Sequence, residues 1–286
     1  MKGRPIAERI RGDVASRVEA LGRRGVRARL GIILAGDDAA SGIYTRSLER
    51  ACEAVGIEVE VSAVPAAAGE AGVAGEIGRF ADDPATHGIL VQQPLPAGVS
   101  ARVVDGIPAS KDVDGATTES MGLLVSGGEG FAPCTPLGVI EILKGWEVPV
   151  AGRDVVIVGR SAVVGRPLAN LLVRKSEAAN ATVTVCHTGT RNLSAHTRRA
   201  EILVAAMGSP RAIGADMLGG EAVVVDVGVN RIEDPDSERG YRVVGDVDFE
   251  SASGKVAAIT PVPGGVGSLT TALLLRNTVE AAEGAA

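Results

Sequence analysis

The sequence predicts an α/β protein with parallel sheets, because short apolar segments alternate with amphipathic segments along most of the chain. The apolar segments are too short for helices and are rich in Val and Ile, as in strands that are buried on both faces. We expect strands at residues 30–34, 57–64, 88–91, 155–158, 181–187, 201–206 and 222–228. We expect helices at residues 5–25, 37–55, 71–80, 136–144, 165–172 and 269–282.

The first series of elements ends near residue 96. Its first helix carries apolar residues at helical spacing, namely Ile6, Ile10, Val14, Val18 and Leu21. Asp37 and Asp38 open the next helix, and Gly56 ends it. Three strand–helix alternations in sequence predict a parallel sheet with helices on both faces.

The second series begins with the helix at residues 136–144 and continues through four strands. Residues 230–257 are charged and irregular, with a short hairpin expected near residues 241–244. The last helix follows the segment TPVPGGVG at residues 260–267. This order predicts a second parallel sheet, again flanked by helices.

Composition excludes several classes of protein. The net charge is −6 and no basic run occurs, which argues against a nucleic-acid partner. No apolar stretch has the length of a membrane span, and the N-terminus lacks the apolar core of a signal peptide. The three scattered cysteines predict reduced thiols in a cytoplasmic protein, and no Cys/His cluster has the spacing of a metal site.

Residues 154–167, DVVIVGRSAVVGRP, combine a strand, a glycine turn and the start of a helix. Gly159 ends the strand and Gly165 lies in the first turn of the helix. The unpaired amides at a helix start attract anions, and Arg160 and Ser161 can bind phosphate oxygens. Only part of the dinucleotide fingerprint is present, so the loop by itself also fits a plain strand–helix turn.

The end of the next strand indicates which nucleotide would bind. No Asp or Glu follows His187 to bind a free ribose 2′-hydroxyl, whereas Thr188 and Arg191 suit a 2′-phosphate. The pattern therefore favours NADP over NAD. His187 is expected to cap its strand or line the nucleotide site rather than to act as a general base.

Other polar residues stand at strand ends or in turns. Gln92 follows a buried strand, where either a solvated loop or a ligand site is natural. Asp112 and Asp114 in KDVDG fit an ordinary Asp-Gly turn as well as a binding site. Tyr44 and Leu48 lie four residues apart and share one helix face.

Taken together, these segments resemble the bifunctional methylenetetrahydrofolate dehydrogenase/methenyltetrahydrofolate cyclohydrolase family. The resemblance runs in order through VQQPLP, KDVDG, PCTP, VVIVGRSAVVGRP, ATVTVCH, ILVAAMG, VVVDVGVN, GDVDFE and ITPVPGGVG. It implies a catalytic, tetrahydrofolate-binding domain at residues 1–135 and 268–286 and a Rossmann-like NADP-binding domain at residues 136–267, with a cleft between them. It also implies a homodimer that works in one-carbon metabolism, with tetrahydrofolate as the one-carbon carrier.

The resemblance also implies roles for individual residues. Tyr44 is similar to the tyrosine that stacks on the folate, Gln92 matches the motif glutamine, and Asp114 matches the aspartate that holds the pterin ring. A carboxylate suits the last task because it accepts two parallel N–H bonds. Pro263 and Gly264 join these as substrate-binding residues. The implied cofactor-binding residues are Gly159, Arg160, Ser161, Val164, Gly165, His187, Thr188, Arg191, Gly208, Val229 and Thr270.

The chain departs from the family pattern at its catalytic lysine. The family has Y-V-x-x-K, and here the lysine position holds Leu48. Arg46 and Arg50 point roughly away from Leu48 on a helix, so neither replaces the amine. Smaller departures are Gln93, Ala116, Ser120 and Ser268.

Loss of the lysine affects the two reactions differently. Oxidation of methylenetetrahydrofolate requires positioning, whereas hydrolysis of the methenyl product requires a proton carrier. We therefore predict a dehydrogenase whose cyclohydrolase step is weak or lost. Three alternatives stay open: a fully bifunctional enzyme, a paralogue acting on another cyclic aminal or imine, and a non-catalytic folate- or nucleotide-binding protein.

Overall fold

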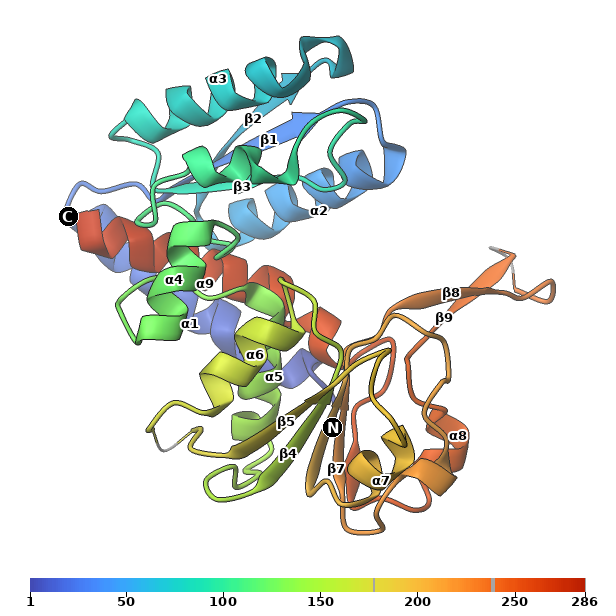
Figure 1. The fold of residues 1–286 in the computed structure, drawn as a ribbon. Helices are drawn as coiled ribbons and strands as arrows, with labels where there is room; N and C mark the ends of the chain where they lie inside the picture. Colours follow the sequence, from blue (N-terminus) through green and yellow to red (C-terminus); the bar gives the residue numbers. More distant parts are fainter. Residues whose placement is uncertain (177, 238–239, 286) are drawn as a thin grey trace. The chain divides into compact units, whose positions relative to one another are not determined.

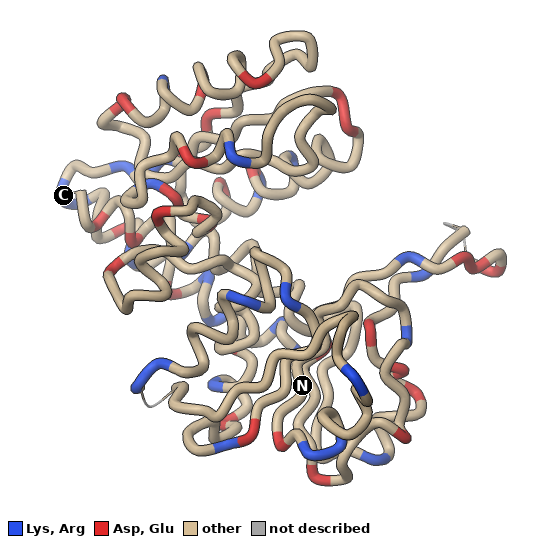
Figure 2. The backbone as a smooth tube through the Cα atoms, viewed as in Figure 1, with Lys and Arg blue, Asp and Glu red and all other residues tan. Residues whose placement is uncertain are grey.

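The computed structural model describes residues 1–176, 178–237 and 240–285, and the chain divides into two compact units. The first unit comprises Glu8–Cys134 and Thr271–Ala286, and the second comprises Met1–Ala7 and Thr135–Thr270. Compared with the domains expected from the sequence, residues 1–7, 135 and 268–270 lie in the second unit. Lys and Arg are interspersed with Asp and Glu along each unit (Figure 2).

The first unit contains a parallel sheet in the order β2-β1-β3. Its strands are β1 (Arg29–Ala35), β2 (Glu58–Val64) and β3 (Gly88–Val91). Val73, Ile77 and Phe80 of α3 pack with Ile33 and Ile89 in one core cluster. Helices α2 and α3 lie on opposite faces of the sheet, which confirms the predicted layers (Figure 1).

The helices of the first unit differ in their capping, and α2 has a capping residue at each end. They are α2 (Ala39–Val55), α3 (Gly69–Asp82), α4 (Thr118–Ser126) and α9 (Thr270–Ala285), while α1 (Arg4–Arg23) begins in the second unit. The Asp38 carboxylate accepts a 2.7 Å hydrogen bond from the Ser41 amide at the start of α2. Gly56 ends α2 with a φ of 82°, a left-handed conformation that favours glycine.

The second unit contains a five-stranded parallel sheet in the order β10-β7-β6-β4-β5. Its strands are β4 (Asp154–Val158), β5 (Thr182–Cys186), β6 (Ile202–Ala205), β7 (Val223–Asp226) and β10 (Ala258–Ile259). Because β4 lies between β5 and β6, the chain reverses its winding direction at β4. Ligands of such sheets bind at the carboxyl ends of the strands beside this reversal.

The helices of the second unit are α5 (Cys134–Gly145), α6 (Gly165–Leu172), α7 (Leu193–Arg198) and α8 (Phe249–Ala252). Strands β8 (Asn230–Glu233) and β9 (Tyr241–Val244) pair antiparallel, which confirms the predicted hairpin. No described helix is both long and apolar enough to cross a membrane.

Candidate functional site

The turn between β4 and α6 can form only with glycine at two positions. Gly159 has a φ of +133°, and a Cβ there would lie 2.0 Å from the Ala206 carbonyl oxygen. A Cβ at Gly165 would lie 2.1 Å from the carbonyl oxygen of Gly159. The two glycines therefore allow the loop to close tightly over the carboxyl end of β4.

Ser161 organises the start of α6. Its Oγ accepts hydrogen bonds from the amides of Val164, at 3.1 Å, and Gly165, at 3.4 Å. Arg160 and Ser161 are both exposed there. A helix start with an exposed guanidinium beside it fits the phosphates of a dinucleotide.

The end of β5 forms a tight turn around His187. The amide of Gly189 donates to His187 Nδ1 at 3.0 Å, and the His187 amide donates to Thr190 Oγ1 at 2.9 Å. This turn leaves Thr188 and Arg191 exposed. The His187 ring thus has a structural role in the turn, whereas Thr188 and Arg191 are accessible to a ligand.

Three residues of the second unit that were predicted to bind substrate or cofactor line one cavity of about 360 Å³. Val229, which is 68% exposed, enters it from the loop after β7, and Pro263 and Gly264 enter it from the loop before α9. The Gly3 amide donates to the Gly264 carbonyl oxygen at 2.8 Å, which ties the start of the chain to this loop. Two further predicted cofactor residues lie near strand and helix ends. Gly208 follows β6 in a left-handed conformation with a φ of +65°. Thr270, the first residue of α9, donates from its Oγ1 to the Gly267 carbonyl oxygen at 3.3 Å.

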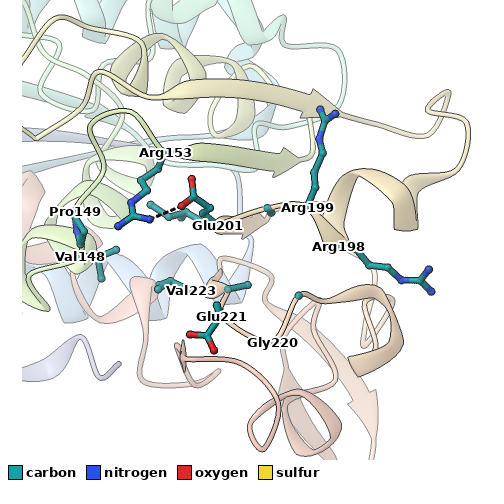
Figure 3. A pocket seen from close by; sticks show the side chains of 13 residues that line it. Val148, Pro149, Arg153, Arg198, Arg199, Glu201, Gly220, Glu221 and Val223 are labelled. Atoms are coloured by element: carbon teal, nitrogen blue, oxygen red, sulfur yellow. Dashed lines mark hydrogen bonds and ion pairs between the residues drawn. The ribbon is translucent and has the colours of Figure 1, made fainter.

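A second cavity of about 510 Å³ lies at the opposite, amino-terminal edge of the same sheet (Figure 3). Arg153 and Glu201 form an ion pair in it. Arg198 and Arg199 extend away from the cavity, where Arg198 Nε donates to the Asp216 carbonyl oxygen and Arg199 Nη2 donates to Thr184 Oγ1. No residue predicted from the sequence to bind substrate or cofactor lines this cavity.

In the first unit, α2 carries Tyr44 and Leu48. Tyr44 is 39% exposed, whereas Leu48 is only 1% exposed. Burial raises the pKa of Tyr44, a hydrogen bond with Thr271 opposes this rise, and the Asp114 carboxylate adds to it. Tyr44 and Asp114 are therefore close enough to interact electrostatically, and Leu48, one helical turn after Tyr44, is a buried aliphatic side chain.

Gln92 lies directly after β3 beside the start of α2. Its amide donates to the Ile33 carbonyl oxygen at 2.9 Å, and its side-chain Nε2 donates to the Gln93 carbonyl oxygen at 3.1 Å. Ser41 Oγ, in the first turn of α2, donates to the same Gln93 oxygen at 3.0 Å. The loop after β3 and the helix of Tyr44 are thus held together.

Asp114 titrates near neutral pH. Burial and, to a smaller extent, the neighbouring Asp112 carboxylate raise its pKa to about 6, against the lowering effect of a hydrogen bond from Cys134. Burial also raises the pKa of Cys134 well above its usual range, so its thiol stays protonated. Asp112 has a structural role, because its carboxylate accepts from the amides of Ala116 and Thr117.

Asn277, Asp226 and Asp246 lie beside the predicted site residues, although the sequence predicted no role for them. Asn277 contacts the backbone beside Asp114, and the two aspartates lie beneath the loops of Gly208 and Val229. Asp226 occurs in VVVDVGVN and Asp246 in GDVDFE. Both motifs contribute to the family resemblance, but the sequence assigned no role to either aspartate.

The first unit holds one lysine and one histidine. Lys111 is the only lysine in residues 8–134 and 271–286, and His87 is the only histidine there. Lys111 Nζ donates to the carbonyl oxygens of Phe80, Ala81 and Asp83 at the end of α3. His87 Nδ1 accepts from the Arg29 amide at the amino end of the sheet, whereas Gln92 follows its carboxyl end.

Comparison with known families covers nearly the whole chain. Residues 1–114 match the model of the tetrahydrofolate dehydrogenase/cyclohydrolase catalytic domain, and residues 133–286 match that of the NAD(P)-binding domain. The bifunctional protein FolD of Natronomonas pharaonis is 48% identical over 281 residues, which cover 98% of this chain and 94% of that protein.

Solved structures show the same similarity. The bifunctional FolD of Campylobacter jejuni superposes with a TM-score of 0.92 at 41% identity, covering 99% of this chain and 98% of that one. The Trypanosoma brucei enzyme, solved with NADP cofactor and an inhibitor, superposes with a TM-score of 0.90 at 34% identity, covering 99% and 96%. Both relatives carry bifunctional names, methylenetetrahydrofolate dehydrogenase and cyclohydrolase.

Proposed function

The chain belongs to the tetrahydrofolate dehydrogenase/cyclohydrolase family, and from this we propose that it oxidises methylenetetrahydrofolate with NADP but hydrolyses the methenyl product weakly or not at all. The observation that carries the proposal is Leu48, which is buried at the position of the family's catalytic lysine. The other predicted substrate residues, Tyr44, Gln92 and Asp114, are present.

The dehydrogenase step depends on positioning. Asp114 accepts N–H bonds from the pterin edge, and Tyr44 and Gln92 hold the folate ring against it. The start of α6, with Arg160 and Ser161, holds the cofactor phosphates. When bound, NADP supplies the hydride acceptor. No residue has to transfer a proton in this step.

The cyclohydrolase step requires a group that moves a proton between water and a ring nitrogen. Such a group contributes about 10²–10⁴-fold to the rate. Leu48 cannot supply it, and the one lysine of the first unit donates to three backbone carbonyls. Burial raises the pKa of Cys52 to about 12 and that of Cys134 well above its usual range, which leaves both thiols protonated.

NADP is favoured over NAD by the groups around β5 and α6. Arg160, Thr188 and Arg191 are exposed donors, and no acidic residue follows His187 in residues 188–192. Guanidinium groups bind a 2′-phosphate, whereas a carboxylate would repel it.

Full bifunctionality is the second candidate function, and one observation favours it. Asp114 has a pKa of about 6, so it can exchange a proton near neutral pH. If it took over hydrolysis, however, it would also have to hold the pterin ring, and that task requires the ionised form.

Two absorbance traces on the purified protein test the proposal. One follows NADPH formation from methylenetetrahydrofolate and NADP, and the other follows methenyltetrahydrofolate, with its decay in buffer as the control. We expect NADPH to form while the methenyl product accumulates. NADPH without accumulation would establish full bifunctionality. Tight NADP binding without turnover would indicate a binding protein, and no reduction with this folate would direct the search to another cyclic aminal.

We further propose that the enzyme works as a homodimer in the cytoplasm. Similarity to the family supports the dimer, and three buried, unpaired cysteines fit a reducing compartment. Light scattering after size-exclusion chromatography tests the dimer directly, since a monomer would give half the expected mass.

A further inference from the structure

Two buried carboxylates, Asp226 and Asp246, lie beneath the loops that follow β6 and β7. Asp226 is 3% exposed and Asp246 is fully buried. Burying a carboxylate is costly unless hydrogen bonds replace its water shell. The hydrogen-bond donors around each carboxylate therefore show which segments it holds in place.

Asp246 holds the loop after β6. Its Oδ2 accepts from the amides of Met207, at 2.6 Å, and Gly208, at 3.0 Å. Its Oδ1 accepts from the Ser209 amide at 2.8 Å and from Asn230 Nδ2 at 2.9 Å. Three successive amides thus converge on one carboxylate, an arrangement that backbone forms around anions. The Asn230 bond connects the same carboxylate to the start of β8.

Asp226 fixes Asp246 in turn. Its Oδ1 accepts from the amides of Gly228, at 2.9 Å, and Asp246, at 3.0 Å, and its Oδ2 accepts from the Val247 amide at 2.8 Å. Gly245 permits this approach, because a Cβ there would lie 1.9 Å from Asp226 Oδ2. Asp226 therefore joins the loop after β7 to the segment that carries Asp246.

Both loops belong to one side of the reversal point in the sheet. The adenosine half of a dinucleotide lies on the β5 side of β4, so the loops after β6 and β7 face the nicotinamide half. These are the loops of Gly208 and Val229. We propose that Asp246, fixed by Asp226, is a positioning residue that holds these two loops for the nicotinamide half of the cofactor. The inference rests on the proposed use of NADP.

Isothermal titration calorimetry with two ligands tests this role on the full chain. NADP spans both halves of the site, whereas adenosine 2′,5′-bisphosphate has the 2′-phosphate half and no nicotinamide. The variant is Asp246→Asn, whose amide nitrogen would face donors in place of an acceptor oxygen. Asp248→Asn is the matched control, because Asp248 makes no side-chain cap bond at the start of α8.

We expect Asp246→Asn to weaken NADP binding about tenfold or more, since hydrogen bonds to a charged acceptor are lost, and to leave the bisphosphate affinity within about twofold. Asp248→Asn should change neither. In steady-state assays the KM for NADP should rise more than the KM for the folate. An equal loss of affinity for NADP and for the bisphosphate, or no loss for either ligand, would overturn the inference.

Asn230→Ala provides a milder variant in case Asp246→Asn does not fold. It removes one donor from Asp246 and leaves the three backbone amides in place. We expect a loss of NADP affinity of about twofold to fivefold, with bisphosphate binding unchanged; an unchanged NADP affinity would contradict the role of Asp246. If the wild-type chain bound no NADP, the proposed cofactor itself would be wrong.

Discussion

The side-chain Nδ2 of Asn277 donates a 2.8 Å hydrogen bond to the carbonyl oxygen of Val113, which lies 164 residues earlier in the chain. Cys134 completes the contact, with its Sγ 3.9 Å from Asn277 Nδ2 and 3.8 Å from the same carbonyl oxygen. All three residues are buried. Helix α9 therefore holds the backbone directly before Asp114.

Replacing Asn277 by Ala should affect both stability and folate binding. The buried carbonyl oxygen of Val113 would lose the hydrogen bond from Asn277, so we expect the free energy of unfolding to fall by about 1–3 kcal/mol. The KM for methylenetetrahydrofolate should rise, because the loop of Asp114 is less well fixed. Urea unfolding and steady-state kinetics measure the two effects. Asn170→Ala, on α6, is the control, and a folate KM equal to that of the wild type would show that Asn277 has no effect on Asp114.

Replacing Leu48 by Lys should restore part of the hydrolysis. The new amine would lie at the position that we propose to correspond to the family lysine, and we expect the rate of methenyltetrahydrofolate hydrolysis to rise about tenfold or more. The decay of the methenyl absorbance measures it. Leu48→Met is the control, because it has similar length and no amine. Equal rates in the two variants would contradict an acid–base role for the position.

Activity should depend on the ionisation of Asp114. Its pKa is about 6, and in the proposed substrate-binding role only the carboxylate form would accept two N–H bonds from the pterin. We therefore expect kcat/KM for methylenetetrahydrofolate to be half-maximal near pH 6, to level off about one pH unit above it and to fall about tenfold per pH unit well below it. Asp114→Asn should be slow at every pH and lose this inflection. An unchanged inflection in the variant would assign it to another group.

The raised pKa of Asp114 also has a consequence for stability. The native state binds the proton more tightly than the unfolded chain, whose aspartates titrate near pH 3.9. Asp114 therefore contributes most to stability at low pH, and this contribution is lost as the pH rises through about 6. The same sign holds for Asp226, whose pKa burial also raises to about 6.

Replacing Arg160 by Ala should change cofactor selectivity. If the guanidinium binds the 2′-phosphate, NADP affinity should fall about tenfold while NAD affinity stays within about twofold. Arg191→Ala should act in the same direction. Calorimetric titrations with both nucleotides give the ratio, and an equal loss for NAD and NADP would rule out binding of the 2′-phosphate by these residues.

Features set by local sequence were predicted well. The turn between β4 and α6 was predicted because Gly159, Gly165 and the apolar strand lie within a dozen residues. Helix α4 was not predicted, since it is short and begins at Thr118, directly after its capping residue Thr117, in a segment without clear apolar spacing. Asp246 and Asn277 were missed because their partners come from distant parts of the chain, and local spacing carries no information about such contacts.

Because Lys111 Nζ donates to three carbonyl oxygens, we expect the only native lysine of residues 8–134 and 271–286 to react slowly with acylating reagents. An amine whose three protons are all engaged is a poor nucleophile toward acylating reagents. In a Leu48→Lys variant, the new side chain would then be the one reactive amine among residues 8–134 and 271–286. Its rate of acylation, followed by peptide mass spectrometry with and without folate, would report directly on how accessible that position is to solvent and substrate.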